Sequence, residues 1–107
     1  MNSGPQFDIR ESEEPGGLRV SVVGELDLAT APALESHLGR LRAEKRPARL
    51  DLSAVQYMDS TGVRILIDAV TQARSDGVPF EVEDSLTPPV KRLFEVVQMH
   101  RLLGEPT

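Results

Sequence analysis

The chain has 107 residues, with 12 Lys and Arg against 17 Asp and Glu, which gives a formal net charge of −5 at pH 7. This length allows one domain of ordinary size, and the acidic balance disfavours general attraction to nucleic acid or to an anionic membrane. The lack of Cys excludes disulfides and thiolate chemistry. The sequence shows neither a basic or apolar leader nor a membrane-spanning stretch, and we therefore expect a cytoplasmic protein.

Period-two alternation predicts two strands at the start of the chain. The pattern is interrupted at residues 13–17, where acidic residues are followed by Pro and two Gly. We therefore expect an antiparallel pair joined by a turn. The alternating apolar residues are Phe7, Ile9, Leu18, Val20 and Val22.

A change of period predicts a helix from Thr30 onward. Thr30 is placed to cap this helix, and Pro32 falls in its first turn, where a missing amide hydrogen does no harm. The apolar residues at helical spacing are Leu34, Leu38 and Leu41.

The second half of the chain predicts two further strands and two further helices. Residues 48–52 and 78–82 alternate as strands, residues 55–62 lead into the second helix, and the third helix opens at residues 86–89. Residues 99–107 show no clear period. The second helix is apolar over a wide arc, so we expect it to be the most buried. Its apolar residues are Val63, Ile65, Leu66, Ile67, Ala69, Val70 and Ala73.

This order of elements predicts a single α/β domain over residues 1–107, with flexible ends at residues 1–5 and 104–107. The crossovers are long enough for right-handed βαβ units, which favours a mixed, mostly parallel sheet. Alternation within the strands implies one apolar and one more polar face. We therefore expect the helices mainly on one face of the sheet.

Several classes of enzyme lack the residues that their chemistry needs. A dinucleotide or P-loop site requires glycines between a strand and a helix, and Gly24 stands alone beside acidic residues. Metal binding needs clustered ligands, and a nucleophilic Ser60 needs a base. The two histidines, His37 and His100, are far apart on polar positions, where solvated side chains are expected.

A domain that accepts phosphate on a strand-end aspartate has a similar order of elements. Such a site needs a Lys at a later strand end, and Lys45 and Lys91 both fall on predicted helices. Asp27, Asp51 and Asp59 can still lie near one another. Capping and turn formation remain the ordinary role of each.

Residues 59–62 (DSTG) open the second helix and allow two interpretations. Ser or Asp before an apolar helical run usually caps the helix, because its oxygen accepts from an otherwise unpaired amide. Alternatively, the Ser60 hydroxyl at the exposed helix start, beside the small Gly62, is accessible to a kinase. A phosphate there would face free amides and the positive end of the helix dipole, while it would repel a partner carboxylate. Phosphorylation would then switch a binding surface off without unfolding the domain.

Two linked motifs resemble those of the STAS family, most closely the bacterial anti-sigma-factor antagonists. One is residues 24–31 (GELDLATA), and the other is residues 50–53 (LDLS) followed by residues 58–63 (MDSTGV). The resemblance spans roughly residues 7–97. It implies a cytoplasmic protein that binds an anti-sigma factor, itself a serine/threonine kinase, and thereby frees a sigma factor. By this resemblance the kinase phosphorylates Ser60 and a separate phosphatase resets it.

The resemblance also implies roles for neighbouring residues. Asp27 would lie beside the phosphorylation loop and help form the partner surface, while Asp59 and Gly62 would shape the loop, and Thr61 is a second candidate for modification. ATP would belong to the kinase, so we expect no enzyme activity and no cofactor in this chain, which would be a monomer or weak dimer. The short segment of residues 99–107 departs from the family pattern, which usually ends with a clear strand and a longer helix.

The alternative within the family is a scaffold subunit without a regulated serine. Such a subunit would be a stressosome component or the cytosolic partner of a lipid or anion transporter.

Overall fold

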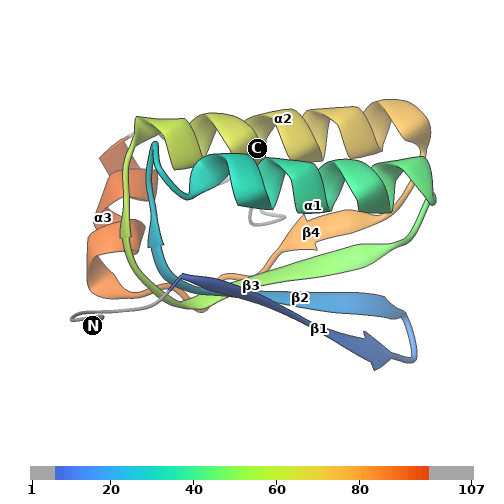
Figure 1. Cartoon of the computed structure of the whole chain (residues 1–107), viewed down its shortest axis with the longest axis horizontal. Helices are drawn as coiled ribbons and strands as arrows, with labels where there is room; N and C mark the ends of the chain where they lie inside the picture. Colours follow the sequence, from blue (N-terminus) through green and yellow to red (C-terminus); the bar gives the residue numbers. More distant parts are fainter. Residues whose placement is uncertain (1–6, 97–107) are drawn as a thin grey trace.

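The elements follow the predicted order and form one sheet with three helices. In the computed structural model, which describes residues 7–96, they are β1 (Asp8–Glu14), β2 (Gly17–Leu26), α1 (Ala31–Ala43), β3 (Ala48–Met58), α2 (Ser60–Asp76), β4 (Phe80–Val82) and α3 (Pro88–Val96). The strand order is β1-β2-β3-β4, with β1 antiparallel to β2 and the other pairs parallel. α1 and α2 lie side by side over one face, and α3 stands at one end of the sheet (Figure 1). The predicted fold class is confirmed.

Some predictions concern residues outside the described range. They are the predictions of flexible ends at residues 1–5 and 104–107, of no clear period over residues 99–107, and of a solvated His100. Within residues 7–96, none of the helices has the length and apolarity needed to cross a membrane.

The core lies between the sheet and the pair α1 and α2. In β2 every second side chain points into it, and α1 contributes the three predicted leucines. Burial of this apolar face supplies the main driving force for folding. The fully buried side chains of largest volume are Leu26, Leu34, Leu50, Leu52, Leu66, Val20, Val22, Val55 and Val90.

β3 is longer than predicted. Two bulges interrupt the alternation of buried and exposed residues in its second half, so the sequence pattern did not show that the strand continues. Opposite β2, the pairing moves from Ser21↔Asp51 to Val23↔Ala54, and then from Gly24↔Val55 to Glu25↔Tyr57. Each shift inserts one extra residue into β3, and such insertions bend a strand and increase its twist. β3 accordingly curves up to the start of α2 at the left of Figure 1. The buried residues after Leu52 are therefore Val55 and Met58.

α2 differs from its predicted burial. It buries five of its 17 residues, and α1 buries four of its 13, so the two helices are buried to a similar extent. Ile67 was expected in the apolar arc, yet it faces solvent with 43% of its surface exposed. The buried set is Gly62, Val63, Ile65, Leu66 and Val70. α2 ends at Asp76, and Gly77 after it caps the helix in the left-handed conformation with φ 73°.

On the inner side of edge strand β1, Ile9 packs against the core, and the positions that follow it on that side carry charge. The Glu11 carboxylate contacts the His37 ring and lies 2.7 Å from Arg40 Nη2, and Glu13 lies 2.8 Å from Arg46 Nη2. The His37 side chain is only 18% exposed. The expectation of a solvated His37 is therefore wrong, since the helix brings its ring against β1. Inward charges of this kind also discourage pairing of an edge strand with another chain.

Candidate functional site

Two loops meet where β2 and β3 end. These strands are parallel neighbours, with Leu26 paired to Met58, and the amide of Asp59 donates to the carbonyl of Leu26 at 3.2 Å. Residues 27–30 and residues 59–62 consequently lie at the same edge of the sheet, at the upper left of Figure 1. We call these two segments the loop edge. The structure thus brings Asp27 next to the segment that holds Asp59, Ser60, Thr61 and Gly62.

Asp59 caps α2. Its backbone is extended, with φ −108° and ψ −174°, and its Oδ1 accepts from the amides of Thr61 at 2.9 Å and Gly62 at 3.3 Å. The capping interpretation is therefore correct for Asp59, and Ser60 is the first residue of the helix. The expectation that a phosphate would face free amides needs correction here, because the carboxylate already occupies those two amides.

Ser60 presents its side chain to solvent at this helix start. It is exposed, whereas Thr61 is half-buried and Gly62 is buried. The positive end of the α2 dipole lies at the same place and favours negative charge. Of the two hydroxyl groups predicted as modification sites, that of Ser60 is the more accessible.

Gly62 packs inward, in contrast to its expected role of leaving access to Ser60. A Cβ atom at this position would lie 2.7 Å from Met58 Cγ and 3.0 Å from Leu26 Cγ. Both distances are far below normal contact between carbon atoms. The missing side chain therefore lets α2 approach the ends of β2 and β3, and that approach places Ser60 at the loop edge.

Asp27 organises the other segment of the loop edge. Its Oδ1 accepts from the amides of Ala29 at 3.0 Å and Thr30 at 3.2 Å. The Thr30 hydroxyl donates to the carbonyl of Glu25 at 2.7 Å and accepts from the amide of Asp27 at 3.0 Å. Thr30 is the N-cap residue of α1, as predicted, but its side chain makes no capping hydrogen bond, because its hydroxyl holds the loop.

Sequence analysis missed three exposed apolar side chains on the segments that meet at the loop edge. Leu28, at the tip of the Asp27 loop, is 74% exposed, and Tyr57, the residue before the end of β3, is 49% exposed. Ile67 follows Ser60 by seven residues, so it lies on the same face of α2. Exposed large apolar groups of this kind often mark contacts with other proteins. Ile67 could have been found by asking which residues share a helical face with Ser60.

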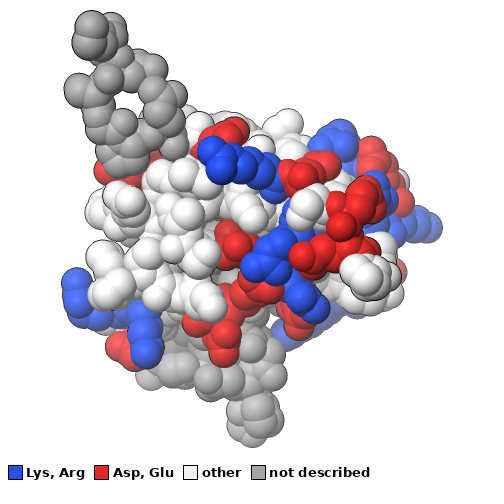
Figure 2. Space-filling view, turned by 90° about the horizontal axis from the view of Figure 1, so that it is seen from below, with Lys and Arg blue, Asp and Glu red and all other residues white. Residues whose placement is uncertain are grey.

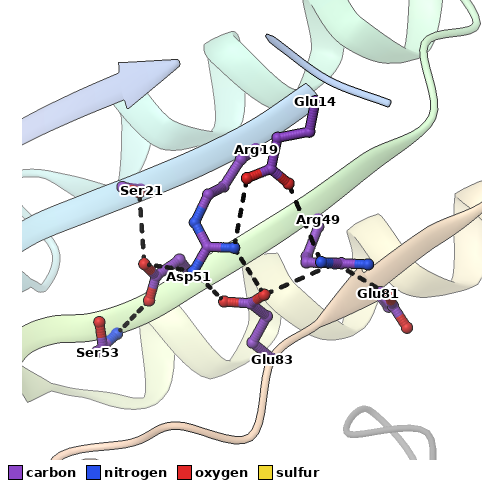
Figure 3. Close-up of polar contacts among 8 residues, drawn as sticks. All are labelled: Glu14, Arg19, Ser21, Arg49, Asp51, Ser53, Glu81 and Glu83. Carbon is purple, nitrogen blue, oxygen red and sulfur yellow. Dashed lines mark hydrogen bonds and ion pairs between the residues drawn. The ribbon is translucent and has the colours of Figure 1, made fainter. Parts of the chain in front are cut away.

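Asp51 belongs to a different site. It lies seven residues before Met58 in β3, on the order of 20 Å along a strand. Its Oδ2 is 3.1 Å from Arg19 Nη2, and its Oδ1 accepts from the amide of Ser53 at 2.8 Å (Figure 3). Burial raises the pKa of Asp51, but the hydrogen bonds from Ser53 and Arg19 outweigh it and hold that pKa below its ordinary value.

The surroundings of Asp51 form a network of ion pairs on the sheet face away from α1 and α2. Arg19 also contacts Glu83 at 2.7 Å, and Arg49 contacts Glu81 at 3.2 Å and Glu83 at 3.6 Å. We call these residues, with Glu14 and Asp51, the sheet network. In Figure 2 charged side chains gather over the right of this face, while its left is largely uncharged. Asp27, Asp51 and Asp59 therefore do not form one cluster.

A groove in the structure lies away from the loop edge. A groove of about 260 Å³ lies between α1, α2 and β4, with Leu38, Ile65 and Phe80 in its wall, and no residue of the loop edge lines it. Within residues 7–96, no group of three His, Asp or Glu side chains is arranged to hold a metal ion. The loop edge instead presents Leu28 and Ser60 to solvent, and exposed groups of this kind suit contact with another macromolecule.

Comparison with known proteins gives consistent matches over most of the chain. A family model described as Mlab, STAS domain matches residues 9–104. The anti-sigma-B factor antagonist of Listeria monocytogenes is 33% identical over 107 aligned residues, which cover 96% of this chain and 88% of that protein. The anti-sigma-B factor antagonist of Bacillus subtilis is 27% identical over 96 residues, 90% of this chain and 85% of that protein.

A solved structure agrees with these matches. The crystal structure of an anti-sigma factor antagonist from Mycobacterium paratuberculosis superposes with a TM-score of 0.78 at 29% identity. The superposition covers 90% of this chain and 81% of that one.

Proposed function

Because the chain belongs to the STAS domain family, we propose that it is an anti-sigma factor antagonist that binds its partner through the loop edge. Its curated relatives carry this function in their names, and the chain spans most of their length. In this proposal residues 1–107 form one domain, which acts in the cytoplasm as a monomer or weak dimer. It works by binding and catalyses no reaction.

The proposed partner is an anti-sigma factor that is also a serine/threonine kinase. That kinase would bind ATP and phosphorylate Ser60. A separate phosphatase would remove the phosphate from Ser60. The observation that carries this proposal is the exposed Ser60 at the first position of α2, held there by the Asp59 cap and the close packing of Gly62. Thr61 is a weaker candidate because it is half-buried.

A phosphate on Ser60 would block binding without unfolding the domain. The helix dipole favours the added charge by about 0.3 to 1 kcal/mol, so the fold tolerates it. In an interface, each charge pressed within about 5 Å of a partner carboxylate costs about 3 kcal/mol at an effective dielectric near 20, and phosphoserine adds nearly two charges. Affinity for the partner should therefore fall at least about a hundredfold.

The first test is phosphorylation by the cognate anti-sigma factor and ATP. Mass spectrometry should find one phosphate on Ser60 in the wild type and in Thr61→Val, and none in Ser60→Ala. Phosphate that remains in Ser60→Ala and disappears in Thr61→Val would transfer the role to Thr61.

The second test is calorimetric titration of the partner with two variants. Ser60→Ala should bind persistently in the presence of ATP, whereas Ser60→Asp should bind poorly. Equal affinities would remove the switch and favour a scaffold subunit that is not regulated at this serine.

A further inference from the structure

An arginine lies one helical turn beyond Ser60 on the exposed side of α2. Ser60, Arg64 and Asp68 are spaced by four residues, so their side chains form a row along the helix, which we call the α2 row. Arg64 Nη1 lies 3.3 Å from Asp68 Oδ2 and 3.8 Å from Glu35 Oε2 in α1. The Arg64 side chain is 57% exposed, so it can change rotamer without disturbing the core.

We propose that Arg64 is the intramolecular partner of a phosphoryl group on Ser60, an inference that rests on the phosphorylation proposed above. Side chains on a helix tilt toward its N-terminus, so the guanidinium of Arg64 can reach back over Ser60. An arginine also matches phosphate geometry, since its planar group can donate two parallel hydrogen bonds.

The phosphate would compete well with the present partner of Arg64. Helical ion pairs are more stable when the anion precedes the cation, which holds for a phosphate on Ser60 and not for Asp68. The phosphate also carries nearly two charges against one on the carboxylate. Modification of Ser60 therefore draws Arg64 away from Asp68 and Glu35.

Two backbone amides at the start of α2 are not free to bind the phosphate. The amides of Thr61 and Gly62 are taken by the carboxylate of Asp59, which also repels a phosphate. The only other basic residue in the sequence of α2 is Arg74, ten residues after Arg64 and about 15 Å farther along the helix. Arg64 is thus the cation of α2 that can neutralise the new charge.

The exchange of partners would extend the effect of the modification. Asp68 and Glu35 lose their shared cation when Arg64 turns to the phosphate. Their carboxylates then add uncompensated negative charge on α2, two turns beyond Ser60, and on the neighbouring α1. A partner surface lying over α2 would be repelled over a wider area than the phosphate alone covers.

The test uses the full chain with phosphoserine installed at position 60 by genetic code expansion, so that no kinase is needed. The second ionisation of phosphoserine ordinarily has a pKa near about 6, and a nearby cation lowers it. A ³¹P NMR titration of Arg64→Gln should show this pKa raised by about 0.3 unit relative to wild type, the shift expected from one exposed helical ion pair. Arg64→Lys should keep part of the lowering.

Arg40→Gln is the matched control. Arg40 is also about half exposed, at 52%, and also has a carboxylate four residues later, Glu44 at 3.7 Å. It lies on α1, outside the α2 row, so its loss should leave the phosphate titration unchanged. Equal midpoints for wild type and Arg64→Gln, or an equal shift in Arg40→Gln, would overturn the assignment.

The two proposals fail in different ways. A shifted titration in Arg64→Gln, with no phosphate on Ser60 after incubation with the kinase, would support the Arg64 contact and remove the proposed switch. Phosphorylation by the kinase without a shifted titration would remove the Arg64 contact alone.

Discussion

The loop edge and the sheet network are both rich in carboxylates, yet they satisfy them in opposite ways. At the loop edge, Asp27 and Asp59 each accept from amides two and three residues ahead, so their hydrogen bonds are local. In the sheet network, Arg19 of β2 joins Asp51 of β3 to Glu83, the residue after β4. The local caps leave neighbouring side chains free to contact a partner. In the sheet network the charged side chains are paired with one another. A count of charged residues would not separate the two regions.

The largest expected effect concerns the packing under the loop edge. Gly62→Ala should destabilise the domain by about 1 to 3 kcal/mol, because its Cβ would overlap Met58. Urea unfolding followed by circular dichroism measures this loss. In Gly39→Ala, where nothing lies within 4 Å of the added carbon, the same change within a helix should stabilise by about 0.5 to 1 kcal/mol. Equal effects at the two glycines would contradict the close approach of α2.

A smaller effect is expected from the local cap. Asp59→Ala should cost about 1 kcal/mol of unfolding free energy, because the amides of Thr61 and Gly62 lose their acceptor. Asp59→Asn keeps a capping oxygen and should lose much less. Thermal unfolding of the two variants measures both losses of stability. An equal loss of stability in Asp59→Ala and Asp59→Asn would show that the charge of Asp59, and not its capping oxygen, stabilises the helix start.

The sheet network should respond to pH. Asp51 has a pKa below its ordinary value of 3.8, so its contribution to stability is present above that pH and is lost as pH falls through the lowered pKa of the folded state. Asp51→Asn should therefore cost about 1 kcal/mol at pH 7 and progressively less below pH 3.8. The measurement is the free energy of unfolding of wild type and of Asp51→Asn from pH 7 to pH 2, and the difference between the two proteins is compared at each pH. A difference that stays constant over this range would exclude the lowered pKa.

Periodicity predicted the order of strands and helices because each core-facing residue follows from the spacing of its own element. The leucines of α1 and the antiparallel start of the sheet were both evident in this way. The helix start at residues 59–62 was also found, because capping depends on residues only two or three positions apart. Local chemistry therefore accounts for most of the fold and for the central part of the loop edge.

The errors concern contacts that depend on distant segments. The bulges of β3 arise from its register against β2, so alternation within β3 could not show that it continues to Met58. His37 meets Glu11 only because α1 packs beside β1, and Asp51 meets Arg19 only because their strands are paired. The exposure of Leu28 depends on which loop faces solvent once the sheet is formed.

The two extra residues of β3 also fix where the serine can stand. Each insertion exchanges the inward and outward sides of the strand, and the pair together restores the original phase by Met58. Deleting Gln56 alone would remove the second bulge, so Met58 would stay inward and opposite Leu26 while β3 lost part of its bend. A straighter β3 would aim the chain differently at the start of α2, and Ser60 would then no longer stand beside residues 27–30.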